Sequence, residues 1–203
     1  MSEPSRPAWL EADSIRLIDR DASMRLEPFL KLDQPLNKSL REQATSRLVE
    51  VRSLAMRGLC ALGIHDSFLV DAFNSKDYHT FWPDLFSAVQ LSLARDPETA
   101  TQIRALFERL RGAEGRQLYR CLWGFSPEQL AEGQATALVD SLGSPSMDIR
   151  VFAFENLYRV VGKTNSYQPG LAPKRQERAI MNWQRDLKNN EITYKTPVLD
   201  PSE

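Results

Sequence analysis

One helix-forming pattern occurs twice in this chain, 98 positions apart, and it constrains the fold more than any other feature. An acidic residue and an arginine begin each copy, Glu50 with Arg52 and Asp148 with Arg150. The apolar positions that correspond are Val51 with Ile149, Leu54 with Phe152, Ala55 with Ala153, Leu59 with Leu157, and Leu62 with Val160. Such repetition is typical of stacked helical units, because one helix pair cannot bury its apolar face alone. The pattern predicts architecture, and no catalytic motif accompanies it.

The spacing of apolar residues predicts helices along most of the chain. Over 38–62 they recur every three or four positions, as on one buried helix face, and a break near Thr45 and Ser46 is left open. The segment 13–36 is expected to hold one or two short helices. Further helices are predicted at 66–73, 83–94, 96–110, 116–123, 126–142, 147–161 and 173–187. No alternating strand pattern competes with them, so we predict an all-α chain.

Several of these helices carry recognisable start and stop signals. Asp96 is the expected N-cap of its helix, and Ser126 with Gln129 has the spacing of a capping box. Gly162 is expected to end the second copy of the repeated helix in a left-handed conformation. Gly133 is expected to disturb the helix over 126–142.

A chain of 203 residues is long enough for one domain with its own core. We predict a flexible N-terminus over 1–12, a single helical domain over 13–188 and a polar tail over 189–203. Three apolar residues of the tail are expected to lie extended over the surface: Ile192, Tyr194 and Val198.

Two buried contacts follow from the repeat. Ala55 and Ala153 occupy the same inward position, so both are expected where two helices approach closely. The helix over 173–187 is expected to cap the array and to bury Trp183. Its expected partners belong to the preceding helix and are chiefly Phe154, Leu157 and Val161.

Composition excludes several classes of partner. The residues are 42% hydrophobic and 26% charged, as in ordinary globular proteins, and the net charge of -1 gives no bulk attraction to nucleic acid or anionic membrane. The N-terminal residues lack an apolar signal core, and no run of about 18 apolar residues is present. We therefore expect a cytoplasmic protein with neither nucleic acid nor membrane as partner. Its oligomeric state, and whether it is a region of a larger protein, stay open.

The segment 126–161 resembles a unit of the HEAT and armadillo repeats. In it a capped helix and a Gly-Ser-Pro break precede a second helix, which begins with an Asp-x-Arg sequence at Asp148 and carries an inward alanine and leucine. The segment 34–63 is similar, and in a third, degenerate unit Arg111 stands at the leucine position. The resemblance implies a short right-handed α-solenoid of HEAT-like antiparallel helix pairs, with about eight to ten helices.

The C-terminal half also resembles the helical tail region of large bacterial regulators, including FecR-like anti-sigma proteins. The residues that carry this resemblance are 122–130, 150–157, Gly162-Lys163-Thr164, Tyr167, Pro169, Arg178 and Trp183. That region has no assigned activity. The resemblance therefore implies a fold and a regulatory or scaffolding context, and no chemistry.

Residues that suggest chemistry have structural interpretations as well. Gly162-Lys163-Thr164 ends like a phosphate-binding P-loop, but the first glycine and the preceding strand of that motif are absent. His65 and His79 lie 14 positions apart across a loop and match no usual metal-ligand spacing. Cys60 and Cys121 stand in apolar helical stretches, where a thiol behaves as a small hydrophobic group.

The sequence shows no set of residues that would form an active site, since its carboxylates are scattered and it has no Gly-x-Ser-x-Gly elbow. We predict no catalytic residues, no cofactor and no metal. The expected function is a non-enzymatic protein–protein interaction or scaffolding module, regulatory in context, whose partner is an unidentified protein or peptide. The candidate binding surface consists of Arg52, Arg150, Trp82, Trp123 and Tyr158, and for each aromatic residue burial in the core is the competing interpretation.

Two other classes of function stay open. Some HEAT-like proteins act on nucleic acid as DNA glycosylases, but these need a strongly basic concave face. An enzyme or cofactor-binding protein with an unrecognised pocket between helices is equally compatible with the composition.

Overall fold

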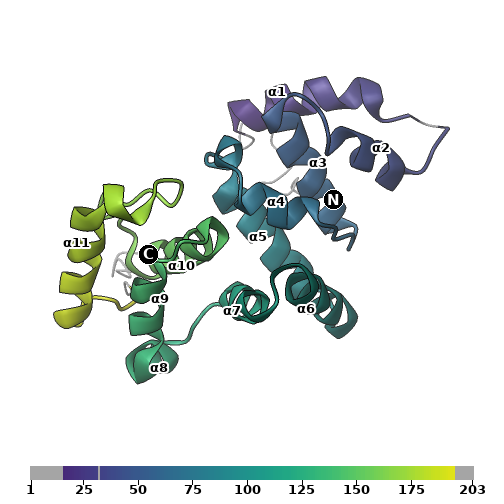
Figure 1. Cartoon of the computed structure of the whole chain (residues 1–203). Helices are drawn as coiled ribbons and strands as arrows, with labels where there is room; N and C mark the ends of the chain where they lie inside the picture. The colour runs from purple at the N-terminus through teal and green to yellow at the C-terminus, as the bar shows by residue number, and fades with distance from the viewer. Residues whose placement is uncertain (1–15, 32, 195–203) are drawn as a thin grey trace, which may run out of the picture. The chain divides into compact units, whose positions relative to one another are not determined.

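A computed structural model describes residues 16–31 and 33–194, and within these ranges the chain is helical and has no strand (Figure 1). The all-α prediction is therefore confirmed. The chain divides into two compact units, of which the first ends at Ile64 and the second begins at His65. The expected flexible N-terminus over 1–12 and the expected surface position of Val198 lie outside the described residues.

The first unit consists of three α-helices and one 3-10 turn within its described part. They are α1 (Leu17–Leu26), η3 (Glu27–Phe29), α2 (Leu36–Gln43) and α3 (Val49–Ala61). The helix α3 packs against both α1 and α2, and Arg57 of α3 forms an ion pair with Asp19 of α1. The chain breaks between α2 and α3, where Thr45 and Ser46 interrupt the apolar spacing. The alternative of a broken helix over 38–62 is the one that the structure shows.

The second unit begins with α4 (Phe68–Phe73), η4 (Lys76–Tyr78), α5 (Trp82–Leu93), α6 (Pro97–Arg111) and α7 (Ala113–Leu122). It continues with α8 (Pro127–Gln129), η5 (Leu130–Gln134), α9 (Ala135–Ser141), α10 (Met147–Val161), η6 (Pro173–Arg175) and α11 (Glu177–Lys188). The helices α6 and α7 pack on each other, and so do α9 and α10. Every helix expected in this half of the chain is present.

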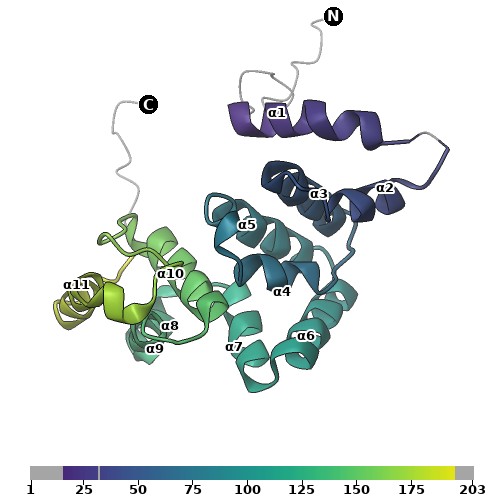
Figure 2. The same cartoon turned by 45° about the horizontal axis from the view of Figure 1, so that its top comes forward.

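The helix α10 packs against α4, α5, α7 and α9 of the second unit (Figure 2). Its Phe152 is fully buried and meets the rings of Phe73, Phe86 and Phe107 edge to face, at centroid distances of 4.7, 5.1 and 5.9 Å. These three rings come from α4, α5 and α6. Because edge-to-face ring pairs add to the free energy of burial, the cluster fixes α10 against three neighbouring segments.

The predicted start and stop signals are confirmed. Asp96 accepts a hydrogen bond from Thr99 N at 2.7 Å, and Ser126 with Gln129 forms a capping box. Gly162 ends α10 in the left-handed region, at φ 70°. At Gly133, with φ 112°, the helix is interrupted by a π-helical turn, which places η5 between α8 and α9.

The two copies of the repeated helix are α3 and α10, and three corresponding apolar positions are buried in both: Val51 with Ile149, Ala55 with Ala153, and Leu59 with Leu157. Ala55 and Ala153 are both fully buried, as predicted. The copies differ at two apolar positions, since Leu54 is half-buried whereas Phe152 is fully buried, and Leu62 is exposed whereas Val160 is buried. The repeat therefore predicts only part of the inward face.

The last helix buries its tryptophan but uses a neighbour other than the one expected. Trp183 is fully buried, which confirms its place in the core. The helix α11 packs chiefly on α9, so the expectation that Phe154, Leu157 and Val161 of α10 supply its main contacts is wrong. The tail beyond α11 also contributes, because Ile192 is buried and the Tyr194 hydroxyl donates to Phe125 O at 2.7 Å.

Candidate functional site

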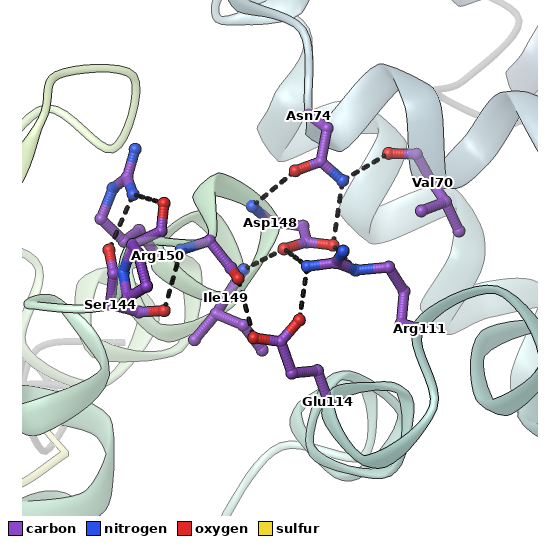
Figure 3. Close-up of polar contacts among 10 residues, drawn as sticks. Val70, Asn74, Arg111, Glu114, Ser144, Asp148, Ile149 and Arg150 are labelled. Atoms are coloured by element: carbon purple, nitrogen blue, oxygen red, sulfur yellow. Dashed lines mark hydrogen bonds and ion pairs between the residues drawn. The ribbon is translucent and has the colours of Figure 1, made fainter.

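A buried acidic residue in the first turn of α10, Asp148, ties several elements together (Figure 3). Its side chain is 1% exposed. Arg111 Nε forms an ion pair with Oδ2 at 2.8 Å, and Arg111 Nη2 donates to Oδ1 at 3.1 Å. Asn74 Nδ2 donates to Oδ2 at 3.0 Å, and Ile149 N donates to Oδ1 at 2.9 Å. Both carboxylate oxygens are thus occupied within the protein, so this network positions α10 and offers nothing to a ligand.

The neighbouring Arg150 anchors two loops. Its Nη1 donates to Ser144 O and to Pro145 O, each at 2.8 Å, and its Nε donates to Pro169 O at 3.0 Å. The guanidinium is buried, and this burial lowers the pKa of Arg150. Arg150, which the sequence predicts as part of a binding surface, therefore connects two loops within the protein.

The loop that follows α10 is fixed at several points. The buried Tyr167 donates its hydroxyl hydrogen to Leu142 O at 2.7 Å, and burial raises the pKa of this phenol. Gln176 accepts a hydrogen bond from Gln168 N at 3.0 Å and donates one to Leu171 O at 2.9 Å. Together with Arg150, these bonds hold the loop as a rigid wall.

This wall, α10 and the segment from η4 to the start of α5 line an open pocket of about 420 Å³. We call it the Glu155 pocket. Its apolar walls are formed by Trp82, Pro83, Phe154, Tyr167, Pro169 and Leu171. Glu155 of α10 lines it from the core side, and the lining also includes Lys76 and His79, both of which are exposed.

Glu155 is the unusual residue of the pocket, because it is 4% exposed and no described residue donates a hydrogen bond to its carboxyl group. Glu155 is nevertheless one of the residues that line the pocket. Burial raises the pKa of Glu155 to about 7; Asp84 raises it further and Arg159 lowers it. A carboxyl group that lacks water and a partner is costly to ionise.

The aromatic walls are held in place by contacts of their own. The Trp82 indole Nε1 donates to Ala72 O at 3.0 Å, which satisfies the polar atom of the ring. Gly170 lies against the same ring, and a Cβ added there would be 3.3 Å from Trp82 Cη2. The Phe154 ring lies 5.6 Å from the Tyr167 ring between centroids. These contacts hold the aromatic walls of the pocket in place.

The structure places the five predicted binding residues at several locations. Trp82 lines the Glu155 pocket, and Tyr158, which is 45% exposed, stacks on Phe154 of that pocket at 6.1 Å. Trp123 is 54% exposed and lines another hollow, which it shares with Arg120, Phe125 and Tyr194. Arg52 is half-buried in α3 of the first unit, and Arg150 is buried as described above. Only Trp82 and Tyr158 thus belong to one neighbourhood.

Sequence reasoning missed Glu155. The periodicity gave no signal, because Glu155 lies two positions from both Ala153 and Leu157 and therefore on the opposite side of the helix from the face that these two share. It is buried because α10 is covered on several sides, by α4, α5, α7 and α9. The pattern cannot tell whether such a charge has a partner, since partners come from distant segments.

Both histidines, which could in principle bind a metal or transfer a proton, have a polar neighbour within the protein. His65 Nε2 lies 2.8 Å from Ser92 Oγ, and His79 Nδ1 lies 3.0 Å from Lys76 O. Within the described residues no group of three or more histidine, cysteine or acidic side chains could hold a metal ion.

The P-loop-like sequence lies at the end of a helix, and the two cysteines are buried. Gly162 ends α10, and Lys163 Nζ lies 2.9 Å from Asp186 Oδ2 and 3.2 Å from Glu191 Oε2. The interpretation of these residues as a helix terminus is confirmed. Cys60 and Cys121 are buried, and burial raises the pKa of each thiol to about 12.

The fold and the site define an all-α protein with an aromatic-walled pocket and one buried acidic group that lacks a hydrogen-bond partner among the described residues. No protein family model matches the chain, and neither a characterised protein nor a solved structure is significantly similar to it. Over the described residues, no helix combines the length and the apolar character needed to cross a membrane. The function is therefore argued from the pocket itself.

Proposed function

We propose that this chain is a non-enzymatic binding module, regulatory or scaffolding in context, that takes a protein or peptide partner through the Glu155 pocket. In this proposal its helices form a short right-handed solenoid of HEAT-like antiparallel pairs. The shared inward face of α3 and α10, with Ala55 and Ala153 fully buried at one register position, supports the repeat. The packing of α6 on α7 and of α9 on α10 supports an arrangement in helix pairs.

One observation carries the binding proposal, the buried carboxyl group of Glu155, without a hydrogen-bond partner among the described residues, in a pocket whose walls are mostly apolar. Burying an ionisable group without a partner lowers the stability of the folded state, and such groups concentrate at functional sites. The walls are rigid aromatic rings, which lose little entropy on binding and dominate the affinity of many interfaces. Beside the pocket, the exposed Tyr158 extends the aromatic surface over which a chain could lie.

The same observation weighs against nucleic acid as the partner. Phosphate groups are recognised by clustered lysine and arginine, whereas the one buried charged group of this pocket's lining is acidic. The net charge of -1 supplies no compensating attraction. A DNA glycosylase activity of the HEAT-like type is therefore disfavoured.

A peptide-display selection tests the proposal. Peptides are selected on the intact chain, and their binding is then measured by fluorescence anisotropy with the wild type, with Tyr158→Ala and with the control Trp123→Ala, which changes the other aromatic hollow. We expect Tyr158→Ala to weaken binding by about tenfold, as for a central interface aromatic, and Trp123→Ala to leave it unchanged. Equal losses in both variants, or a loss in Trp123→Ala alone, would contradict the pocket as the binding site.

One observation favours a second candidate function. A carboxyl group whose pKa is raised to about 7 is suited to act as a general acid or base, which would make the chain an enzyme. A panel of ester, amide and phosphoester substrates separates the two proposals. If the wild type turns over a substrate and Glu155→Gln does not, the chain is an enzyme and the non-enzymatic proposal is wrong.

A further inference from the structure

We infer that the Glu155 pocket binds a primary alkylammonium group, with the nitrogen on the Glu155 carboxylate and the carbon chain against the aromatic walls. The source of such a group is the end of a lysine side chain or a free amine. Only the first source depends on the binding function proposed above.

The internal repeat provides the first argument. Arg57 occupies the position in α3 that Glu155 occupies in α10, 98 positions later. Arg57 forms an ion pair with Asp19, so the charge at this register is compensated inside the first unit. Glu155 forms no hydrogen bond or ion pair with a described residue, although the charge of Arg159, four positions later on the same helix, lowers its pKa. The second copy thus has a buried carboxyl group at this position without a direct ion pair, which a ligand from outside can supply.

Charge and hydrogen bonding determine which ligand fits. An ionised carboxyl group accepts hydrogen bonds and donates none, so it calls for a cationic donor and repels an anion. An ammonium group has three N–H donors, of which two can reach the carboxylate oxygens. A guanidinium has five donors and would turn the remaining three toward apolar walls, at a cost in desolvation. A primary ammonium therefore matches a single carboxylate better.

The walls suit the rest of the ligand. Trp82, Phe154 and Tyr167 present aromatic rings, which attract a nearby cation and bury an alkyl chain. A hard metal ion needs six or more oxygen ligands, and one carboxylate among rings does not supply them. The pocket of about 420 Å³ has room for an unbranched chain and its charged end.

The charged groups around Glu155 define how binding should depend on pH. Asp84 of α5 raises the pKa of Glu155 and Arg159 of α10 lowers it, while Lys76 and His79 line the pocket beside η4 and Tyr167 lines it from the loop. With a pKa of about 7, the free Glu155 is mostly protonated at pH 6 and mostly ionised at pH 8. A primary amine stays protonated over this range, its pKa being about 10.4. Binding of the ammonium should therefore strengthen from pH 6 to pH 8 and release a proton.

Titration calorimetry and amide NMR of the intact chain test the inference with n-butylamine, its neutral analogue 1-butanol and its anionic analogue butyrate. We expect n-butylamine to bind at least about tenfold more tightly than the other two, because charge-assisted hydrogen bonds are the stronger ones. Glu155→Gln should remove this preference, whereas Glu132→Gln, which changes an exposed glutamate elsewhere, should keep it. Equal binding of butylamine and butanol to the wild type overturns the inference even if the Glu155→Gln variant does not fold.

The same titrations identify the source of the ammonium. Nα-acetyl-lysine amide and the norleucine analogue form one arm, and spermidine forms the other. Tighter binding of the lysine amide than of its norleucine analogue supports a lysine side chain of a partner. If the free amines bind and the lysine amide does not, the inference is supported, but a lysine of a partner protein is ruled out as the ligand of this pocket. Selected peptides that bind independently of lysine and of Glu155 overturn the inference and leave the binding function standing.

The pH dependence needs one control. His79 also lines the pocket, so the effect of its side chain on binding must be separated from that of Glu155. In His79→Gln the increase in affinity with pH should persist. Loss of the increase in His79→Gln, with its retention in Glu155→Gln, overturns the assignment to Glu155.

Discussion

Asp148 Oδ2 lies 2.8 Å from Arg111 Nε, and this ion pair joins the first turn of α10 to the last residue of α6. The sequence places Arg111 where a degenerate repeat would carry its inward leucine. The structure shows why an arginine stands there, since its guanidinium neutralises a carboxylate that is otherwise buried. Arg111, which replaces the leucine of the repeat, and Asp148, which begins the second helix of the next unit, thus form one ion pair.

Replacing one member of this pair should destabilise the chain more than replacing both. Arg111→Met leaves Asp148 buried with only Asn74 and a backbone amide as donors, and we expect a loss of about 2 to 4 kcal/mol in the free energy of unfolding. The double variant Arg111→Met with Asp148→Leu should recover part of that loss, because no buried charge is left. Urea unfolding of the two variants measures the difference. Equal loss in both would show that the pair contributes through packing alone.

The buried alanine of α10 should not tolerate a larger side chain. Ala153 is fully buried at the register position that Ala55 occupies in α3, so Ala153→Leu adds volume to a packed contact. We expect it to cost about 1 to 3 kcal/mol of stability. Ala137→Leu is the matched control, because Ala137 is exposed in the helix α9. Thermal melting that is the same for both variants would speak against the close approach.

What could be predicted from the sequence is what local chemistry decides. The capping box at Ser126, the cap at Asp96 and the stop at Gly162 each depend on a few adjacent residues, and all three are present in the structure. The buried pair Ala55 and Ala153 also follows from periodicity alone.

What could not be predicted depends on distant segments. The periodicity of α11 shows that Trp183 faces inward, but it cannot show that α9 rather than α10 lies opposite. The sequence predicts Arg150 as part of a binding surface, yet three backbone carbonyls from two loops accept hydrogen bonds from its buried guanidinium. The Glu155 pocket could not be predicted for the same reason, because only the folded chain shows which segments surround Glu155.

Trp183 should be essential for the packing of α11. It is fully buried, and its truncation to alanine typically costs about 3 to 5 kcal/mol, a large share of the stability of a domain. Trp183→Phe should cost less, because the indole Nε1 has no hydrogen-bond partner in the described part of the chain. Lys188→Ala, at the exposed end of the same helix, should be neutral. Denaturant midpoints of the three variants check this order, and a parent-like midpoint for Trp183→Ala would remove the residue from the core.

Nucleic acid should not bind at physiological salt. The net charge of -1 provides no counterion-release term large enough to hold duplex or single-stranded DNA. A mobility-shift assay at about 150 mM salt is therefore expected to show no submicromolar complex. A salt-sensitive complex in that range would reveal a local basic patch and return a nucleic-acid function to first place.

Glu155 should make the stability of the chain fall as the pH rises from about 4.5 to about 7. Its pKa is raised from 4.5 to about 7 by burial, so in this range the folded chain keeps a proton that the unfolded chain has lost. The contribution of the protonated group is therefore complete below pH 4.5, is lost as the pH passes through 7 and does not change above that. The loss is on the order of 1 to 3 kcal/mol. Because the other ionisable groups are the same in both chains, the measurement is the difference in unfolding free energy between the wild type and Glu155→Gln, which should grow in favour of the variant across this window. A difference that stays constant from pH 4.5 to pH 8 would show that Glu155 is ionised in the folded chain throughout, with a counter-charge already in place, and the pocket would then have no need of a cationic ligand.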